Sequence, residues 1–356
     1  MTSPGSRIRV GLDQRLSAYR PGGISRYATE LGTALAELPE IDLVRLLHRS
    51  DRSLDEEGIR LRTPPHHRLE PLAIGTELML KRERLDVYHA TDFVAPSFVR
   101  APVIATVHDL AFIRWPDQLR RDALAYYRKI LRQSGRTAHW ITPSAWTRSE
   151  LVDLVGIDER SISVIPHGVS SFVSSGNIQD RDERGPYIVA VGTVEPRKRY
   201  SLLLDALERM RPRPELVIVG APGWNTDDLQ HRIRRAEPVT WLSNATDADI
   251  NRLLSNALAL AIPSLAEGFG LGALEAMACG TPVVSSGLGA LSEVTGDAAV
   301  VPDLDEPQSW ADAIESVIHD DERWRKLSAD GAARAREFTW ESTARRTACV
   351  YREITG

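Results

Sequence analysis

The chain has 356 residues, 42% of them hydrophobic and 26% charged, and carries a formal net charge of -5. This length is about twice that of a usual domain, so two domains are expected, and the composition excludes a disordered or fibrous chain. The net charge excludes a chain-wide basic surface for nucleic acid, and two distant cysteines, Cys279 and Cys349, support neither a disulfide framework nor a thiolate zinc site.

Short apolar runs alternate with amphipathic stretches along the first half of the chain. Such runs are typical of buried parallel strands, and the stretches between them of the helices that cover those strands. The predicted strands are residues 8–12, 43–47, 87–89, 103–107, 140–142 and 162–165. A polar segment at 177–186 has no apolar period and ends in Gly-Pro, which predicts a linker.

The same alternation resumes after the linker, with predicted strands at 187–191, 216–219, 239–242, 258–262, 283–285 and 299–301. The pattern predicts an α/β protein with two Rossmann-like, doubly wound domains. We place the first at 1–176 and the second at 187–338. A final helical segment with apolar anchors, at 339–356, is expected to pack back on the first domain.

No segment predicts secretion or a membrane span. Residues 1–10 lack the apolar core of a signal peptide, and the longest uncharged apolar stretch, 253–266, is short and contains Ser, Asn and Pro. With only two cysteines, a reducing compartment fits the chain. We therefore expect a cytoplasmic protein.

The first motif in chain order is a glycine pair, Gly22-Gly23, which follows the strand at 8–12 and opens a helix. Two glycines let a ligand approach the main chain closely. An ordinary tight turn is the alternative, and the pair alone does not decide between them.

His108 follows the predicted strand at 103–107 in the run Thr106-Val-His-Asp109. It is therefore expected at the carboxyl edge of the sheet, where open α/β folds bind their ligands. A structural histidine is the alternative.

Two cations, Arg197 and Lys198, lie in the turn between the strand at 187–191 and the next helix. Cations at a helix N-terminus oppose the helix dipole, so their placement there costs stability unless an anion offsets it. A diphosphate would supply that anion. A solvated helix start, including Arg199, is the alternative.

The richest motif is Glu267-Gly-Phe-Gly-Leu-Gly-Ala-Leu-Glu275, between a buried strand and a helix. Backbone N–H groups around Phe269, Gly270 and Leu271 would form an anion site at the start of that helix. The two carboxylates would flank this site and accept hydrogen bonds from sugar hydroxyls, which suits a sugar nucleotide. A tight turn with solvated glutamates is the alternative.

This motif resembles the signature of the family 4 retaining glycosyltransferases, which have the GT-B fold of two domains facing a cleft. The resemblance implies contacts of Glu267 with the donor sugar, of Glu275 with the nucleotide ribose, and of Arg197 and Lys198 with the diphosphate. It further implies that Gly22 and Gly23 contact the donor phosphates or border the acceptor. His108 would lie beside the donor sugar, as a catalytic residue with Glu267, Arg197 and Lys198. Arg199 departs from the family, in which many relatives have Asn or Gly there.

The resemblance implies transfer of a hexose from a nucleotide sugar, bound mainly by the second domain, to an acceptor bound mainly by the first. It implies a retaining front-face reaction without metal or other cofactor. Similarity to bacterial polysaccharide mannosyltransferases favours GDP-mannose as donor, with a glycan, lipid-linked or small-molecule hydroxyl as acceptor. A sugar-nucleotide epimerase, a phosphorylase and a non-catalytic sugar-nucleotide-binding scaffold are the alternatives.

A basic helix pattern at 117–136 offers a second kind of partner. Its cations would contact anionic lipid at the inner face of the membrane or a lipid-diphosphate acceptor, and a solvated helix face is the alternative. They are Arg120, Arg121, Arg128, Lys129, Arg132 and Arg136.

Overall fold

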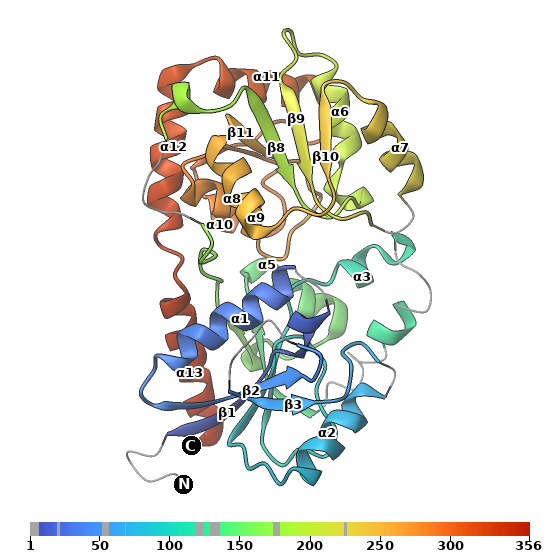
Figure 1. Cartoon of the computed structure of the whole chain (residues 1–356), viewed down its shortest axis with the longest axis vertical. Coiled ribbons are helices and arrows are strands. Elements are labelled where there is room, and N and C mark those ends of the chain that lie inside the picture. The colour runs from blue at the N-terminus through green and yellow to red at the C-terminus, as the bar shows by residue number, and fades with distance from the viewer. Residues whose placement is uncertain are drawn as a thin grey trace. The chain divides into compact units, whose positions relative to one another are not determined.

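The computed structural model describes residues 7–19, 22–51, 57–67, 69–118, 124–128, 136–173, 179–223 and 226–356. The chain forms two compact units (Figure 1). The first comprises Met1–Pro116, Arg121–Gly168 and Thr339–Gly356, and the second comprises Asp117–Arg120 and Val169–Phe338.

The first unit contains a seven-stranded sheet in the order β3-β2-β1-β4-β5-β6-β7, in which every pairing is parallel. All six strands predicted for this half are present, and the short edge strand β3 was not predicted. The strands are β1 (Ile8–Asp13), β2 (Ile41–His48), β3 (Ile59–Leu61), β4 (Val87–Ala90), β5 (Val103–Thr106), β6 (Thr137–Thr142) and β7 (Ile162–Val164). The helices of this unit include α1 (Gly23–Ala36), α2 (Glu70–Leu80), α3 (Ala111–Arg114) and α5 (Ala145–Glu150).

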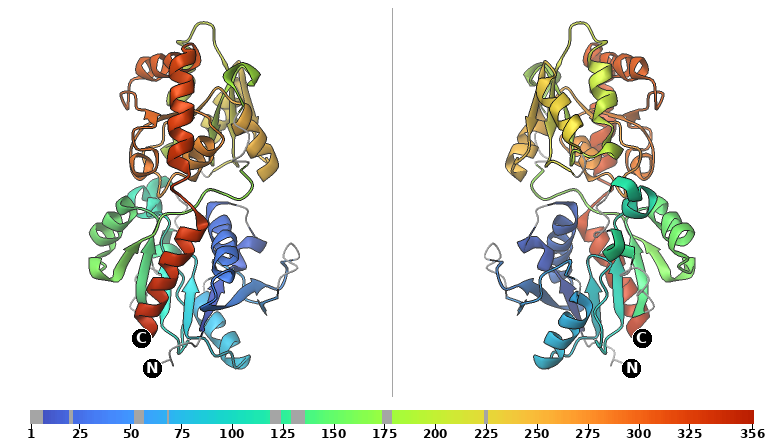
Figure 2. Two further views of the ribbon diagram at one scale, coloured as in Figure 1. Left: turned by 90° about the vertical axis from the view of Figure 1, so that its left-hand side faces the viewer. Right: turned by 90° about the vertical axis from the view of Figure 1, so that its right-hand side faces the viewer.

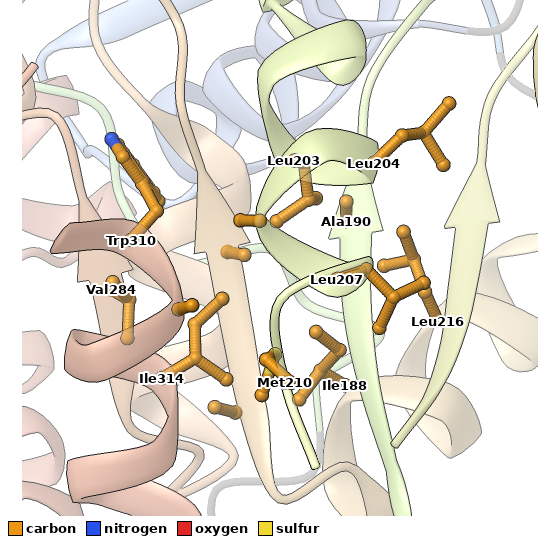
Figure 3. Close-up of a cluster of buried hydrophobic side chains, with 14 of the residues drawn as sticks. Ile188, Ala190, Leu203, Leu204, Leu207, Met210, Leu216, Val284, Trp310 and Ile314 are labelled. Carbon is orange, nitrogen blue, oxygen red and sulfur yellow. The ribbon is translucent and has the colours of Figure 1, made fainter. Parts of the chain in front are cut away.

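The second unit contains a six-stranded parallel sheet in the order β10-β9-β8-β11-β12-β13. Its strands are β8 (Tyr187–Val191), β9 (Glu215–Val219), β10 (Val239–Leu242), β11 (Ala259–Ile262), β12 (Val283–Ser285) and β13 (Ala299–Val300). Its helices are α6 (Tyr200–Leu207), α7 (Asp227–Arg235), α8 (Asp247–Asn256), α9 (Leu271–Ala278), α10 (Leu291–Thr295), α11 (Pro307–Ile318) and α12 (Asp321–Ala335). Apolar side chains of α6 and α11, including Leu203, Leu207, Trp310 and Ile314, pack on one face of this sheet (Figure 3).

The polar segment that follows the first half of the chain is anchored to the second unit. The buried guanidinium of Arg184 donates to the carbonyl oxygens of Cys279 (2.9 Å) and Ala257 (3.1 Å), and it stacks over Trp324 at 4.9 Å. The segment thus contributes a buried side chain to the second unit. The border between the two compact units lies at Gly168, upstream of the predicted linker at 177–186.

The last helix, α13 (Trp340–Thr355), belongs to the first unit, as predicted from its apolar anchors. Its buried Trp340, Ala344, Ala348 and Tyr351 lie in one hydrophobic cluster with Tyr27 and other residues of α1. The small alanines let the two helices approach closely. Figures 1 and 2 show α13 beside α1 although they stand at opposite ends of the sequence.

Both sheets reverse their strand order once, between β1 and β4 in the first unit and between β8 and β11 in the second. In open α/β sheets, ligands bind outside the carboxyl ends of the strands at such a reversal. The loops after these four strands are therefore the places to look for a site.

No helix among the described residues is long and apolar enough to cross a bilayer.

Candidate active site

The loop after β8 places two cations at the strand reversal of the second unit. A single helical turn, Pro196–Lys198, ends at Arg199, which has a left-handed backbone (φ 53°) before α6 begins. Asn and Gly adopt this conformation most readily. The backbone here therefore suits the Asn or Gly of many relatives better than it suits Arg199. The Arg199 side chain turns to Asp305, with 2.5 Å between Nη2 and Oδ1.

Gly192, the first residue after β8, leaves room for Lys198. It has φ 146°, and a Cβ placed on it would lie 3.1 Å from Lys198 Cε and 3.2 Å from Nζ. Any side chain at position 192 would therefore displace the ammonium group. The close approach explains a glycine that the sequence motifs did not single out.

Glu267, in the loop after β11, forms ion pairs with both cations. Lys198 Nζ donates to its Oε1, and Arg197 Nη1 lies 3.5 Å from its Oε2. The hydroxyl of Ser264 also donates to Oε1, at 2.7 Å. The side chains of Lys198, Arg197 and Glu267 are only 11–14% exposed, so solvent screens these pairs weakly.

The charges of this cluster determine its protonation. Burial alone would raise the pKa of Glu267, but Lys198 and Arg197 outweigh burial and lower the pKa to about 2. Glu267 is therefore a carboxylate at every physiological pH. An ionised carboxylate only accepts hydrogen bonds, which is the capacity that a sugar hydroxyl needs in its partner.

Backbone hydrogen bonds hold the loops of this cluster together. Leu265 N donates to Arg197 O at 2.8 Å, which ties the loop after β11 to the loop after β8. Ala290 N donates to Glu267 O at 3.1 Å, which adds the loop after β12. Three loops of one sheet edge thus fix the position of Glu267.

The helix that follows Glu267 supplies a partial positive charge. α9 begins at Leu271, after Gly270, whose φ is 105°. Unpaired N–H groups and the helix dipole favour an anion at such a terminus. Phe269 is buried at this start and contacts Phe338, with ring centroids 5.9 Å apart. The predicted anion site at the start of α9 therefore lies next in the chain after the loop that carries Glu267.

Glu275 lies inside α9 and is 2% exposed. Its Oε1 accepts a hydrogen bond from Ser170 Oγ at 2.6 Å. Ser170 was not predictable from local spacing, because it lies 105 residues from Glu275 in the chain.

His108 follows β5 at the carboxyl edge of the first sheet. Its Nε2 lies 2.8 Å from the carbonyl oxygen of Thr91, so Nε2 carries the proton and donates it. Its Nδ1 then accepts from His167 Nε2, at 3.3 Å. Contacts within the first unit thus engage both ring nitrogens of His108.

His167 and a third histidine, His89, complete a neutral cluster around Tyr27. His89 lies 2.7 Å from the hydroxyl of Tyr351 and 2.8 Å from that of Thr106. Burial lowers the pKa of His89 to about 3, and it also lowers the pKa of His108 and His167. The cluster therefore carries no charge near neutral pH.

Gly22 lies at the N-terminus of α1, with an extended backbone that any residue adopts (φ 165°). A Cβ on Gly22 would meet no atom within 4 Å. Neither backbone nor packing within the described residues requires glycine there. Gly23 is the first residue of α1.

Two sequence families match the chain. "Glycosyltransferase Family 4" matches residues 21–171, and "Glycosyl transferases group 1" matches residues 175–334. The O-antigen chain mannosyltransferase B of Escherichia coli is 30% identical over 94% of this chain and 97% of the relative. This chain belongs to the family 4 (group 1) glycosyltransferases. The family expectation from the motif at 267–275 is thereby confirmed.

Further relatives agree with this assignment. The glycosyltransferase is 27% identical to the O-antigen chain mannosyltransferase RfbU of Salmonella typhimurium, over 83% of this chain and 87% of the relative. Among solved structures, sucrose-phosphate synthase from Thermosynechococcus elongatus superposes with a TM-score of 0.76 at 20% identity, over 98% and 99% of the two chains. Anabaena Alr3699/HepE, in complex with UDP and glucose, has a TM-score of 0.73 at 19% identity, over 98% and 100% of the two chains. These likenesses confirm the predicted GT-B fold.

The predicted site residues of the glycosyltransferase thus fall into two groups. Arg197, Lys198 and Glu267 contact one another in the second unit, with the start of α9 next in the chain, whereas Glu275 is held separately by Ser170. His108, Gly22 and Gly23 lie in the first unit. Of the cations predicted at 117–136, Arg128 and Arg136 are exposed, and Arg120, Arg121, Lys129 and Arg132 lie outside the described residues.

Some contacts that position the site were not predicted from the sequence. Ser264 stands three residues before Glu267, so its local hydrogen bond was open to prediction from spacing. Glu195, which accepts from Arg197 Nε at 2.9 Å, stands two residues before its partner. His167 had no such signal, because its contact with His108 spans 59 residues.

In the described part of the chain, no group of three or more His, Cys, Asp or Glu side chains is arranged to hold a metal ion.

Proposed function

We propose that this glycosyltransferase transfers a hexose, with retention of anomeric configuration, from a nucleotide sugar to an acceptor hydroxyl. GDP-mannose is the favoured donor, and the acceptor is a glycan, a lipid-linked sugar or a small molecule. The observation that carries the proposal is the contact of Lys198 and Arg197 with an ionised Glu267 at the strand reversal of the second sheet. Near-full-length similarity to a mannosyltransferase supports the choice of sugar.

In the proposed reaction, the bond between the anomeric carbon and the donor diphosphate breaks as the acceptor oxygen bonds to the same face of the sugar. The acceptor proton passes to the departing diphosphate. Lys198, Arg197 and the N-terminus of α9 stabilise the charge that grows on the diphosphate, which needs no metal ion. Glu267 accepts hydrogen bonds from the sugar hydroxyls, and Glu275 holds the ribose.

His108 acts in this scheme as a neutral group beside the sugar. Because Thr91 and His167 engage both of its ring nitrogens, the ring does not exchange a proton with the acceptor. This assignment agrees with the lowered pKa of His108. Gly22 and Gly23 border the donor phosphates, where a side chain would limit their approach.

We further propose that the glycosyltransferase works in the cytoplasm and contacts the inner face of the membrane. The supporting observation is the similarity to two O-antigen chain mannosyltransferases.

The first test is a donor panel. Thermal unfolding is recorded in EDTA with GDP-mannose, UDP-glucose and dTDP-rhamnose, for the parent protein and for Glu267→Gln. We expect stabilisation by GDP-mannose, by about 3 kcal/mol at one hundred times the dissociation constant, and a weaker effect in the variant. A larger shift with UDP-glucose, a ligand of Alr3699/HepE, would overturn the donor assignment.

The second test follows the product by proton NMR with the preferred donor and a mannoside acceptor. Formation of an α-linked product from the α-linked donor is the expected result. An inverted product would overturn retention. Conversion of the donor without acceptor would indicate an epimerase, and binding without turnover would indicate a scaffold.

A further inference from the structure

Helix α2 of the first unit is apolar on both of its sides. Ile74 and Leu78 are buried against the unit. On the outer side lie Leu69, just before the helix, and then Leu72, Met79 and Leu80, which are 58%, 46%, 63% and 72% exposed. A helix with apolar side chains on two sides normally packs both of them against other elements. One apolar side of α2 is thus left exposed in this chain.

These residues are concentrated on one surface. Of the eight large hydrophobic side chains exposed in the described part of the chain, five belong to α2 or to the adjacent loop. They are Leu69, Leu72, Met79, Leu80 and Phe98, and we call them the α2 patch. Figures 1 and 2 show α2 at the outer surface of the first unit. Single exposed hydrophobics are ordinary, but a cluster of five marks a contact surface.

Phe98 is held next to α2 by its neighbour in the chain. Ser97 N donates to Pro71 O at 2.6 Å, and a Cβ on Gly75 would lie 1.6 Å from Ser97 O. Phe98 itself is 68% exposed and has a left-handed backbone (φ 63°), which is unfavourable for a bulky side chain. The fold therefore holds an aromatic ring at the surface in a strained conformation.

The outer side of α2 offers few groups for hydrogen bonding. Between Leu72 and Met79, the Thr76 hydroxyl already donates to Leu72 O at 2.8 Å, and the partly buried Glu77 carboxylate accepts from the backbone N–H groups of Arg62 and Thr63. A protein partner usually finds about one hydrogen bond per 100–200 Å² of interface. Acyl chains need none, so the chemistry of this side favours lipid.

Cations border the α2 patch. Lys81, Arg82 and Arg84 follow the helix directly, and Arg100 follows Phe98; all four are exposed, and none forms an ion pair with another described residue. Arg136 stands over the Phe98 ring at 5.6 Å. Apolar side chains beside exposed cations match the boundary between acyl chains and anionic headgroups.

We propose that the α2 patch docks the enzyme on an anionic lipid bilayer. Leu72, Met79, Leu80 and Phe98 enter the headgroup region, and Lys81, Arg82, Arg84 and Arg100 contact lipid phosphates. The patch replaces the segment at 117–136 as the main membrane contact, with Arg136 at its edge. Docking is separate from sugar transfer and does not depend on the donor assignment.

The test is co-sedimentation of the full chain with vesicles of phosphatidylcholine alone or with three parts in ten of phosphatidylglycerol. We expect binding to the anionic vesicles, weakened by added salt. Met79→Glu with Leu80→Glu should reduce binding by about tenfold or more, because charged side chains enter the headgroup region poorly. Lys81→Glu with Arg82→Glu should remove the preference for anionic lipid, because each cation contributes about a fivefold factor.

Leu154→Glu and Val301→Glu are matched controls, since both parent residues are exposed hydrophobics outside the patch, at 40% and 57%. They should bind vesicles as the parent does. All variants should retain the parent's far-UV circular dichroism and its transfer to a water-soluble acceptor, which separates docking from catalysis. Absence of binding to anionic vesicles at low salt would overturn the proposal. A dimer in solution that Leu80→Glu dissociates, without vesicle binding, would overturn it in favour of a second copy.

Discussion

The two units place different chemistry at the same edge of similar sheets. In the second unit, Lys198 and Arg197 surround an ionised Glu267. In the first unit, His89, His108 and His167 are buried and neutral. Burial has opposite results because Glu267 has counter-charges within 4 Å and the histidines have hydroxyl, carbonyl and imidazole partners. An anionic ligand should therefore find its charge partners in the second unit.

The largest expected effect comes from removing a cation of the second unit. Lys198→Ala should lower kcat/KM by about 10²–10³-fold, because the departing diphosphate loses a positioned charge. Lys326→Ala, at an exposed lysine that pairs with Asp330 on α12, is the matched control and should leave kcat/KM unchanged. Initial rates below the unfolding temperature measure both. A loss of under about threefold in Lys198→Ala would place the diphosphate elsewhere.

The neutral histidines predict an acid sensitivity of the first unit. The pKa of His89 is about 3 in the folded protein, against 6.5 ordinarily, so between these values only the unfolded chain binds the proton. Stability should therefore fall as pH drops below about 6.5, by up to about 1.4 kcal/mol per pH unit for each such histidine. Urea unfolding followed by circular dichroism at pH 7, 6 and 5 measures this slope.

His89→Gln tests the origin of that slope. The variant should be less stable at pH 7, by about 1–3 kcal/mol, since Tyr351 and Thr106 lose a fitted partner. Its stability should also change less steeply between pH 7 and 5 than that of the parent. His231→Gln, on the exposed side of α7, should retain the parent's slope. Equal slopes in all three proteins would contradict the assignment to buried histidines.

Alanine substitution at two glycines, Gly22 and Gly192, should change stability by different amounts, and the change at Gly22 should be the smaller. Gly22→Ala should change the free energy of unfolding by about 0.5 kcal/mol or less, because its Cβ meets nothing and its backbone is extended. If Gly22 borders the donor phosphates, the donor dissociation constant should nevertheless rise. Gly192→Ala should instead lose about 1–3 kcal/mol of stability through its positive φ and the contact with Lys198. Calorimetry and donor titration of both variants measure the contrast; unchanged donor binding by Gly22→Ala would remove Gly22 from the site.

Much of the fold was predictable because parallel strands carry a local signal. Runs such as Tyr187–Val191 are apolar on both faces, and the alternation of strands and helices specifies a doubly wound sheet. β3 was missed because it is a three-residue edge strand with the charged Arg60 at its centre. The border between the units was not predictable from polarity, because the polar stretch contains Arg184, whose carbonyl partners are distant in sequence.

In the candidate site, too, the features that depend on nearby residues were predictable, and the contacts between distant residues were not. Spacing alone placed Glu267 before a helix start and Arg197 and Lys198 in a turn, since each depends on neighbours a few residues away. The pairing of Lys198 with Glu267 spans 69 residues and required the three-dimensional sheet. The partner of Glu275, Ser170, and the partner of His108, His167, are long-range contacts of the same kind.

By itself, the sequence determined the alternation of strands and helices, the motif at 267–275 and the family that this motif resembles. These features depend on local periodicity and on residues close together in the chain. Only the tertiary structure decided the protonation state of Glu267 and of the histidines, because charge partners and burial come from distant segments. It also decided which apolar residues stay outside: α2 carries apolar residues on two sides, and only packing shows that Met79 and Leu80 are left uncovered.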